Sequence, residues 1–277
     1  MKKVLFYLLF SFVFLACNKD DDDNTETATP ADNPIPEKYR ALQGIFDGNG
    51  IGAATDLGMG VMLLFNQDGD KYAWYEDEEV KVVLDFDDSE SIFRDSQLPS
   101  AGAACLTTAS RLYIFNEEGE QYTFAEFDDS DVEGGWNDED LFEWSSGFSN
   151  TNQWGPDNTI SFDRVSAMWT LTNPGDGCFD AFVEYQTMNM ADSNGDQMQP
   201  YDIPGFFFSD GPFDTDLWTA ENNCGGADGL IPFDRISAAC RYIEPNRIDE
   251  LLFSADGTQF CFYSVSEGIV SEIFDLY

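Results

Sequence analysis

Short apolar runs separated by polar turns dominate the chain from about residue 50 to its end. Residues 61–65 (VMLLF) form one such run, residues 66–69 (NQDG) form a turn that ends in glycine, and residues 71–75 (KYAWY) alternate aromatic with smaller or charged residues. Residues 80–86 supply a further run. Runs of this length bounded by Asn, Asp and Gly are typical of β-strands joined in hairpins. No segment shows a convincing amphipathic helix of three turns, and residues 241–252 are the nearest. The pattern predicts an all-β protein.

The pattern repeats without a gap at an offset of fifty residues. Four features recur: Gly-Ala-Ala at 52–54 and 102–104, Phe-Asn at 65–66 and 115–116, glycine at 69 and 119, and tyrosine at 72 and 122. A second match pairs residues 160–167 with residues 231–238, and the last copy continues through residues 239–240 and 252–260. We expect copies near residues 50–100, 101–155, 156–228 and 229–277. The third copy has diverged most, and residues 178–185 stand where its second strand is expected.

Four copies of about 50–70 residues indicate an array or a propeller. Each copy supplies about four strands, and its first strand is rich in small residues, as neighbouring inner strands at a crowded central axis require. We therefore expect a four-bladed β-propeller of about four-stranded blades. A β-sandwich built from duplicated hairpins is the alternative.

The repeat resembles a known family. Ala103-Ala104, the Leu-Tyr-Ile-Phe of residues 112–115, and Gln121-Tyr122 together resemble a hemopexin-type repeat. That resemblance covers about residues 50–277 and implies a four-bladed propeller whose blades open with Asp-Ala-Ala. Here Gly52, Gly102 and Ser237 stand in place of that Asp. The haem-binding histidines of the family's namesake have no counterpart, because the chain contains no histidine.

The N-terminus has the form of an export signal. Lys2 and Lys3 precede an apolar run over residues 4–14, which is too short for a membrane span of about 20 residues but suits a signal peptide. Ala16-Cys17 resembles a lipobox, although Leu15 lies one position later than the usual leucine. The resemblance implies a lipoprotein signal peptide over residues 1–16 and acylation of Cys17. A buried cysteine in a transmembrane helix is the alternative.

The segment after Cys17 is acidic. Residues 18–23 (NKDDDD) resemble the export tag of Gram-negative surface lipoproteins, which implies an outer-membrane lipoprotein exposed at the cell surface. An acidic run that simply holds the chain off the membrane is the other interpretation. We expect a disordered acidic tether over residues 17–40 and a repeat-containing β domain over residues 41–277.

Composition excludes several functions. The formal net charge of −40 repels nucleic acid, and it fits either solubility in a salty habitat or a cationic partner. Without histidine, Ser-His-Asp catalysis and His-ligated zinc are excluded. Paired carboxylates still permit glycoside hydrolysis, although no particular pair stands out among 53 acidic residues.

Calcium is the one cofactor that the sequence suggests. Asp192, Asn194 and Asp196 supply oxygen atoms at positions 1, 3 and 5, as in calcium loops, but Gln197 replaces the glycine that should follow. A polar surface turn is the alternative.

An oxidising compartment favours disulfides. Besides Cys17 there are five cysteines. They fit two disulfides and one leftover thiol, and the sequence does not determine the connectivity. Cys178 and Cys224, which both lie in Gly-rich segments, are the first pair to consider, and Cys240 with Cys261 is the second.

Other conspicuous residues favour structural roles. Packing beneath a loop is the preferred interpretation of Trp136, Trp144 and Trp154, ahead of stacking on sugars. The repeated Asp-Arg pairs at 163–164 and 234–235 suggest clamps between blades. The resulting hypothesis is a surface-exposed, lipid-anchored, non-enzymatic binding module for an extracellular protein or glycan. A carboxylate-dependent extracellular polysaccharide hydrolase and a structural envelope protein are the alternatives.

Overall fold

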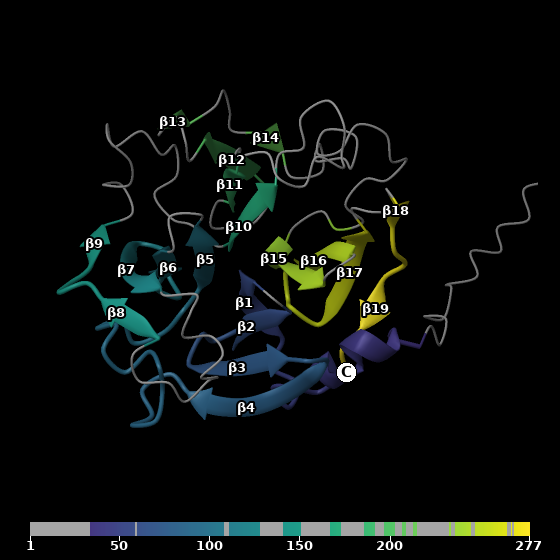
Figure 1. Ribbon diagram of the computed structural model, residues 1–277, viewed down its shortest axis with the longest axis horizontal. Coiled ribbons are helices and arrows are strands. Elements are labelled where there is room, and N and C mark those ends of the chain that lie inside the picture. The colour runs from purple at the N-terminus through teal and green to yellow at the C-terminus, as the bar shows by residue number, and fades with distance from the viewer. Residues whose placement is uncertain are drawn as a thin grey trace, which may run out of the picture. The chain divides into compact units, whose positions relative to one another are not determined.

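The computed structural model describes residues 34–58, 60–107, 111–127, 141–150, 167–172, 186–191, 197–202, 207–208, 213–214, 233, 236–244, 247–264, 267 and 269–277 of the 277-residue chain (Figure 1). Pro34–Tyr277 is one compact unit that opens with a 3-10 helix, η1 (Glu37–Leu42). Tyr39 in η1 is fully buried, so the unit begins at residue 34 and the tether predicted over residues 17–40 extends too far. Among the described residues, no helix has the length and apolar character of a membrane span.

The described residues form four antiparallel sheets, each following the chain strand by strand. The first contains β1 (Ile51–Gly58), β2 (Val61–Asn66), β3 (Lys71–Glu76) and β4 (Glu79–Asp85). The second contains β5 (Ala103–Thr107), β6 (Arg111–Phe115), β7 (Gln121–Phe127) and β8 (Phe142–Trp144), with β9 (Ser149–Asn150) also beside β7.

The third sheet contains β10 (Ala167–Thr172), β11 (Gln186–Ala191), β12 (Gln197–Asp202) and β13 (Phe207–Phe208), with β14 (Phe213–Asp214) also beside β12. The fourth contains β15 (Ile236–Glu244), β16 (Arg247–Ser254), β17 (Gln259–Ser264) and β18 (Ile269–Val270), with β19 (Phe274–Asp275) also beside β17. The prediction of an all-β chain is confirmed, and the sheets contain four or five strands where about four were predicted.

The sequence repeat is also a repeat of strand register. An alanine of the first strand lies opposite a phenylalanine of the second in three sheets: Ala53 opposite Phe65, Ala103 opposite Phe115, and Ala238 opposite Phe253. The equivalent pair in the third sheet is Ala167 and Ala191. The second strand of that copy is therefore Gln186–Ala191, and its predicted position at residues 178–185 is wrong.

The first strands of the four sheets meet one another. β1 contacts β5 and β15, and β10 contacts the same two strands, so the four strands complete a cycle. Figure 1 shows the sheets extending outward from this common centre. The arrangement is propeller-like. It explains why the first strands carry alanine or glycine, because four strands at one centre leave little space for side chains.

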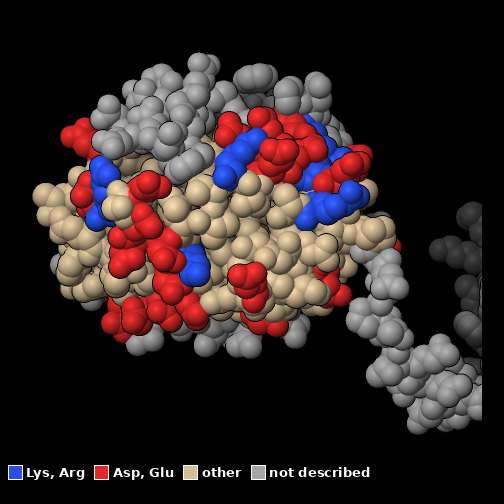
Figure 2. Space-filling model, turned by 90° about the horizontal axis from the view of Figure 1, so that it is seen from below, with Lys and Arg blue, Asp and Glu red and all other residues tan. Residues whose placement is uncertain are grey.

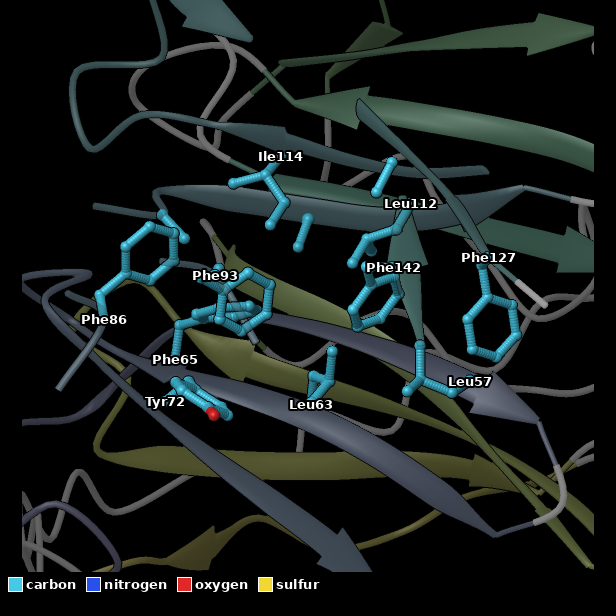
Figure 3. Close-up of a cluster of buried hydrophobic side chains, with 14 of the residues drawn as sticks. Leu57, Leu63, Phe65, Tyr72, Phe86, Phe93, Leu112, Ile114, Phe127 and Phe142 are labelled. Atoms are coloured by element: carbon cyan, nitrogen blue, oxygen red, sulfur yellow. The ribbon is translucent and has the colours of Figure 1, made fainter. Parts of the chain in front are cut away.

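The apolar cores lie between neighbouring sheets. One cluster joins the first two sheets and includes Leu63, Phe65 and Leu112, together with Phe93 of the connecting segment (Figure 3). Phe86 and Phe93 stack there with ring centroids 4.8 Å apart. A second cluster joins the fourth sheet, the first sheet and η1. Each fully buried phenylalanine contributes about 1.5–3 kcal/mol, so these inter-sheet layers hold the sheets side by side.

Candidate functional site

The hairpin turns between second and third strands share one conformation. Gly69, Gly119 and Gly257 all have a left-handed φ, at 69°, 67° and 64°. The N–H of each donates to the carbonyl three residues earlier, at 2.9, 2.8 and 2.8 Å respectively. A left-handed residue is costly for any side chain with a Cβ, which explains the recurring glycine.

Two of these turns also join one sheet to the next through the backbone. The Gly69 carbonyl accepts a hydrogen bond from the N–H of Ala101 at 2.9 Å, and the Gly257 carbonyl accepts one from Ile51 at 2.9 Å. A Cβ on Gly69 would lie 2.6 Å from the Ala101 oxygen, and one on Gly257 would lie 2.3 Å from the Ile51 backbone. The glycine is therefore required twice, for its φ and for this close approach.

Acidic side chains occupy the outer positions of the same turns. The glycines are buried, whereas the acidic residues beside them are exposed: Asp68, Asp70, Glu117, Glu118, Glu120 and Asp256. Some are ordered locally, since Asn66 donates to Asp70 and Asn116 to Glu118, each at 2.7 Å. The Ser254 hydroxyl and the Thr258 N–H and hydroxyl donate to Asp256, and together they lower the pKa of that carboxyl.

The residues predicted to bind calcium lie outside the described residues. The flanking strands nevertheless define their place in the repeat, because Ala191 pairs with Met198 as Phe65 pairs with Tyr72. Residues 192–196 therefore connect β11 to β12, as residues 66–70 connect β2 to β3. Among the described residues, no group of three or more His, Cys, Asp or Glu side chains is placed to hold a metal ion. Calcium binding by Asp192, Asn194 and Asp196 stays a prediction.

A buried ion pair links the first and fourth sheets. The Arg241 guanidinium on β15 donates to both Asp56 oxygens on β1, at 3.2 and 3.3 Å. Burial lowers the pKa of Arg241, but the Asp56 charge, the hydrogen bonds to Asp56 and the nearby Glu250 together outweigh burial and leave that pKa above its usual value. This pair clamps two neighbouring sheets, the role that the sequence assigned to residues 163–164 and 234–235. Those four residues lie outside the described set.

A second buried carboxylate holds the N-terminal segment. Asp249 on β16 has no exposed surface and accepts hydrogen bonds from the Tyr39 hydroxyl at 2.5 Å and from Arg247 at 2.7 Å. Lys38 also pairs with it. Burial and the Asp249 charge raise the pKa of Tyr39. The chain just before the first sheet is therefore clamped to the fourth sheet.

These two buried carboxylates are engaged in structural ion pairs. Each lies against one or more cations, so both carboxylates are already taken up by contacts within the fold. Sequence reasoning missed both Asp56 and Asp249. The only available signal was that basic residues are scarce, so each basic residue is a candidate for a specific ion pair.

The predicted Cys240–Cys261 disulfide is wrong. Cys105, Cys240 and Cys261 are free and buried. Cys240 on β15 pairs with Leu251, while Cys261 on β17 pairs with Leu252, so β16 separates the two thiols. Two strand spacings amount to about 9–10 Å. A disulfide requires a Cα–Cα distance of about 4.4–6.8 Å.

The remaining candidates are mostly outside the described residues. Trp144 is an exception: its indole N–H donates to the Ile92 carbonyl at 2.9 Å and its ring packs against Phe93 and Phe142. This confirms a packing role for Trp144. The following predicted residues lie outside the described set: Cys17, Trp136, Trp154, Cys178 and Cys224.

Comparison with known proteins supports the fold. No family model and no curated protein sequence matches the chain. Among solved structures, a hemopexin-fold protein, CP4 from cow pea, is similar with a TM-score of 0.54 and 13% identity, over 82% of this chain and 93% of that chain. Hydrazine synthase from Kuenenia stuttgartiensis, at a TM-score of 0.30 and 11% identity, covers 83% of this chain and 50% of its own. The likeness to CP4 shows a hemopexin-like fold.

Proposed function

We propose that this protein is a lipid-anchored, cell-surface binding module built on a closed four-bladed β-propeller. The cycle of contacts among β1, β5, β10 and β15 supports closure. The likeness to a hemopexin-fold protein supports the same architecture. The module is non-enzymatic and binds an extracellular protein or glycan.

This proposal depends on one observation: in the hairpin turns the backbone is buried between sheets while the acidic side chains are exposed. Backbone atoms and buried glycines join one sheet to the next, while the acidic side chains of those turns remain exposed. Because the turns occupy equivalent positions in the repeat, they lie at the same end of their sheets. The scaffold thus presents loops from several sheets on one acidic face, which suits a partner that carries positive charge or a glycan bound through carboxylates and bridging calcium.

The anchor is proposed from the sequence of the N-terminus. Acylated Cys17 would hold the module at the outer leaflet of the outer membrane, and residues 18–33 would connect it to the compact unit that begins at Pro34. Sixteen residues span at most about 55 Å when fully extended. The module would therefore operate within that distance of the membrane.

Protease treatment of intact cells tests the location. Cells that express the full chain are treated with protease, and the protein is followed by immunoblot beside a Cys17→Ala variant. Surface anchoring is supported if the intact band disappears from cells whose outer membrane has not been opened, and if the Cys17→Ala variant is released from the membrane fraction. Protection until the outer membrane is opened would instead require a periplasmic role.

A binding assay separates a binder from a hydrolase. The purified protein is incubated with insoluble polysaccharides of plant, algal and microbial origin and with immobilised basic proteins, and both retention and the release of reducing ends are measured. Retention without reducing-end release supports the proposal. Release of reducing ends that persists through repeated purification would show catalysis and contradict it.

A further inference from the structure

The outermost strand of the first sheet differs from its counterparts. β4 is a strand of seven residues that pairs with β3 alone within the described part of the chain. Its register against β3 shifts once, at Lys81, between the Trp74–Val82 and Tyr75–Val80 pairs. In the other three sheets the corresponding edge is divided into two short strands of two or three residues each: β8 and β9, β13 and β14, and β18 and β19. A long unpaired edge is the part of a sheet most able to pair with another chain.

The side chains of β4 alternate between the two faces of the sheet. Val80, Val82 and Leu84 pack against the inter-sheet cores. The outward row consists of Glu79, Lys81, Val83 and Asp85, which are all exposed, and the exposed fraction of Val83 is 41%. Figure 2, which views the molecule from the side where β4 lies, shows acidic side chains in separate groups with a few basic side chains among them. The outward row of β4 itself carries Lys81 between acidic residues, so this edge is not uniformly acidic in spite of the net charge.

The backbone of β4 has an outward-facing pair of groups at Val83. Phe86, just after β4, donates its N–H to the Asp70 carbonyl at 2.6 Å, so it bonds toward β3. Successive residues of an antiparallel strand bond alternately toward one neighbour and the other. Leu84 and Val82 therefore also bond toward β3, and the N–H and C=O groups of Val83 and Asp85 point away from the sheet.

We propose that β4 pairs antiparallel with β4 of a second copy of this chain, about a two-fold axis at Val83. In this register Val83 lies opposite its own counterpart, and its outward N–H and C=O form the reciprocal hydrogen bonds of an antiparallel pair. β4 is regular from Val82 to Asp85, and the exposed Lys81 side chain follows at the register shift, so Lys81 of each copy faces Asp85 of the other. The central part of the outward row, from Lys81 to Asp85, is thus complementary to itself in charge, as a two-fold interface requires.

Neighbouring registers lack this complementarity. A two-fold axis at Val82 places Glu79 opposite Asp85, and an axis at Lys81 places the two lysines opposite each other. Existing partners of the two charged residues do not compete strongly. Lys81 contacts Glu79 at 3.1 Å and Lys71 contacts Asp85 at 3.7 Å, both at exposed positions where an ion pair contributes little.

The net charge opposes this association at low salt. Two chains of formal charge −40 repel each other, and Glu79 of one copy approaches Asp87 of the other. In about 1 M salt the Debye length falls to about 3 Å, so long-range repulsion is screened while directly opposed backbone groups still bond. We therefore expect the dimer to form more readily as ionic strength rises.

Disulfide trapping at the two-fold axis tests the register. In a hydrogen-bonded antiparallel pair the Cα atoms lie about 5.5 Å apart, which suits a disulfide. Cells that express the full chain with Val83→Cys are oxidised briefly in high salt, and the protein is examined by non-reducing electrophoresis. Ile269→Cys is the matched control, because Ile269 is also an exposed apolar residue (55%) on an outer strand, in the fourth sheet. We expect a disulfide-linked dimer from Val83→Cys and none from Ile269→Cys.

Charge reversal supplies the decisive comparison. This comparison is made at about 0.15 M salt, where exposed charges are screened less than in about 1 M salt. In the Val83→Cys background, Lys81→Asp places like charges opposite each other twice and should reduce the trapped dimer about threefold. The exchange Lys81→Asp with Asp85→Lys restores opposite charges and should restore the dimer. Arg111→Asp, an equal charge change on β6, should have no effect. The proposal is overturned if the double exchange traps no more dimer than Lys81→Asp, if both cysteine variants dimerise equally, or if Val83→Cys is trapped mainly on another protein.

Discussion

The Gly257 carbonyl accepts a hydrogen bond from the N–H of Ile51 at 2.9 Å, and this bond joins the last repeat to the first. The Ser237 hydroxyl reinforces it by donating to the Ile51 carbonyl at 2.7 Å. The same relationship joins Gly69 to Ala101 between the first two sheets. The junction between the two ends of the domain thus repeats the junction between the first two sheets. The contacts of the N-terminal segment with Asp249 add a second link between the first and last parts of the domain.

Replacing Gly257 should weaken this junction more than its φ alone explains. Gly257→Ala adds a Cβ 2.3 Å from the Ile51 backbone as well as placing alanine in the left-handed region, and we expect a loss of about 3 kcal/mol in the free energy of unfolding. Gly44→Ala is the matched control, because Gly44 has a φ of 71° and nothing within 4 Å of an added Cβ. It should lose about 1 kcal/mol. Urea unfolding followed by tryptophan fluorescence measures both. Equal losses would show that the close approach contributes nothing.

The buried ion pair should depend on both partners. Arg241→Met leaves the Asp56 carboxylate buried without its cation, and we expect a loss of about 3–5 kcal/mol. The double variant Asp56→Val with Arg241→Met removes that uncompensated charge and should recover at least half of the loss. Urea unfolding of four proteins forms a double-mutant cycle: the parent, Arg241→Met, Asp56→Val and the double variant. Additive losses would contradict a direct pair.

Local repetition made much of the fold predictable from the sequence. In three copies the turn glycine follows the phenylalanine of the second strand by four residues: Phe65–Gly69, Phe115–Gly119 and Phe253–Gly257. Register and turn type therefore follow from local chemistry. The third copy failed because residues 178–185 are apolar and aromatic enough to be read as a strand. The better signal was Gly195, four residues after Ala191, since Gly69 follows Phe65 by the same interval. That interval places the end of the second strand at Ala191, where β11 ends.

Long-range pairing was not predictable in this way. Asp56 and Arg241 are 185 residues apart, and Tyr39 and Asp249 are 210 apart. Nothing local distinguishes these carboxylates from the other acidic residues of the chain. The acidic, proline-containing stretch before Tyr39 also hid the point where the compact unit begins, because composition carries no information about a distant binding partner.

The three buried thiols should be unreactive in the folded protein. Burial raises the pKa of Cys105 and Cys240, and it raises that of Cys261 to about 12, so little thiolate forms at pH 8. We expect iodoacetamide to leave all three unmodified in the folded protein and to modify all three after denaturation without reductant. Peptide mass spectrometry measures each site. If Cys240 and Cys261 react only after a reductant is added, the two residues form the disulfide that the structure contradicts.

Asp256 should make the last hairpin turn sensitive to acid. Because the folded state lowers the pKa of this carboxyl below its usual 3.8, the stabilisation is present above that pH and is lost as the pH falls through the lowered value. Asp256→Ala should therefore be less stable than the parent near neutrality, and the difference should shrink below about pH 4. Urea midpoints across a pH series measure the difference.

Thr258→Val is the companion variant for this test. It removes one hydroxyl donor, at 2.8 Å from the Asp256 carboxylate, while the N–H of residue 258 is retained. In the Thr258→Val background the pKa of Asp256 should lie closer to its usual value, so the difference between aspartate and alanine at position 256 should close at a higher pH. A difference that is independent of pH would show that Asp256 acts through packing of the turn and not through its charge.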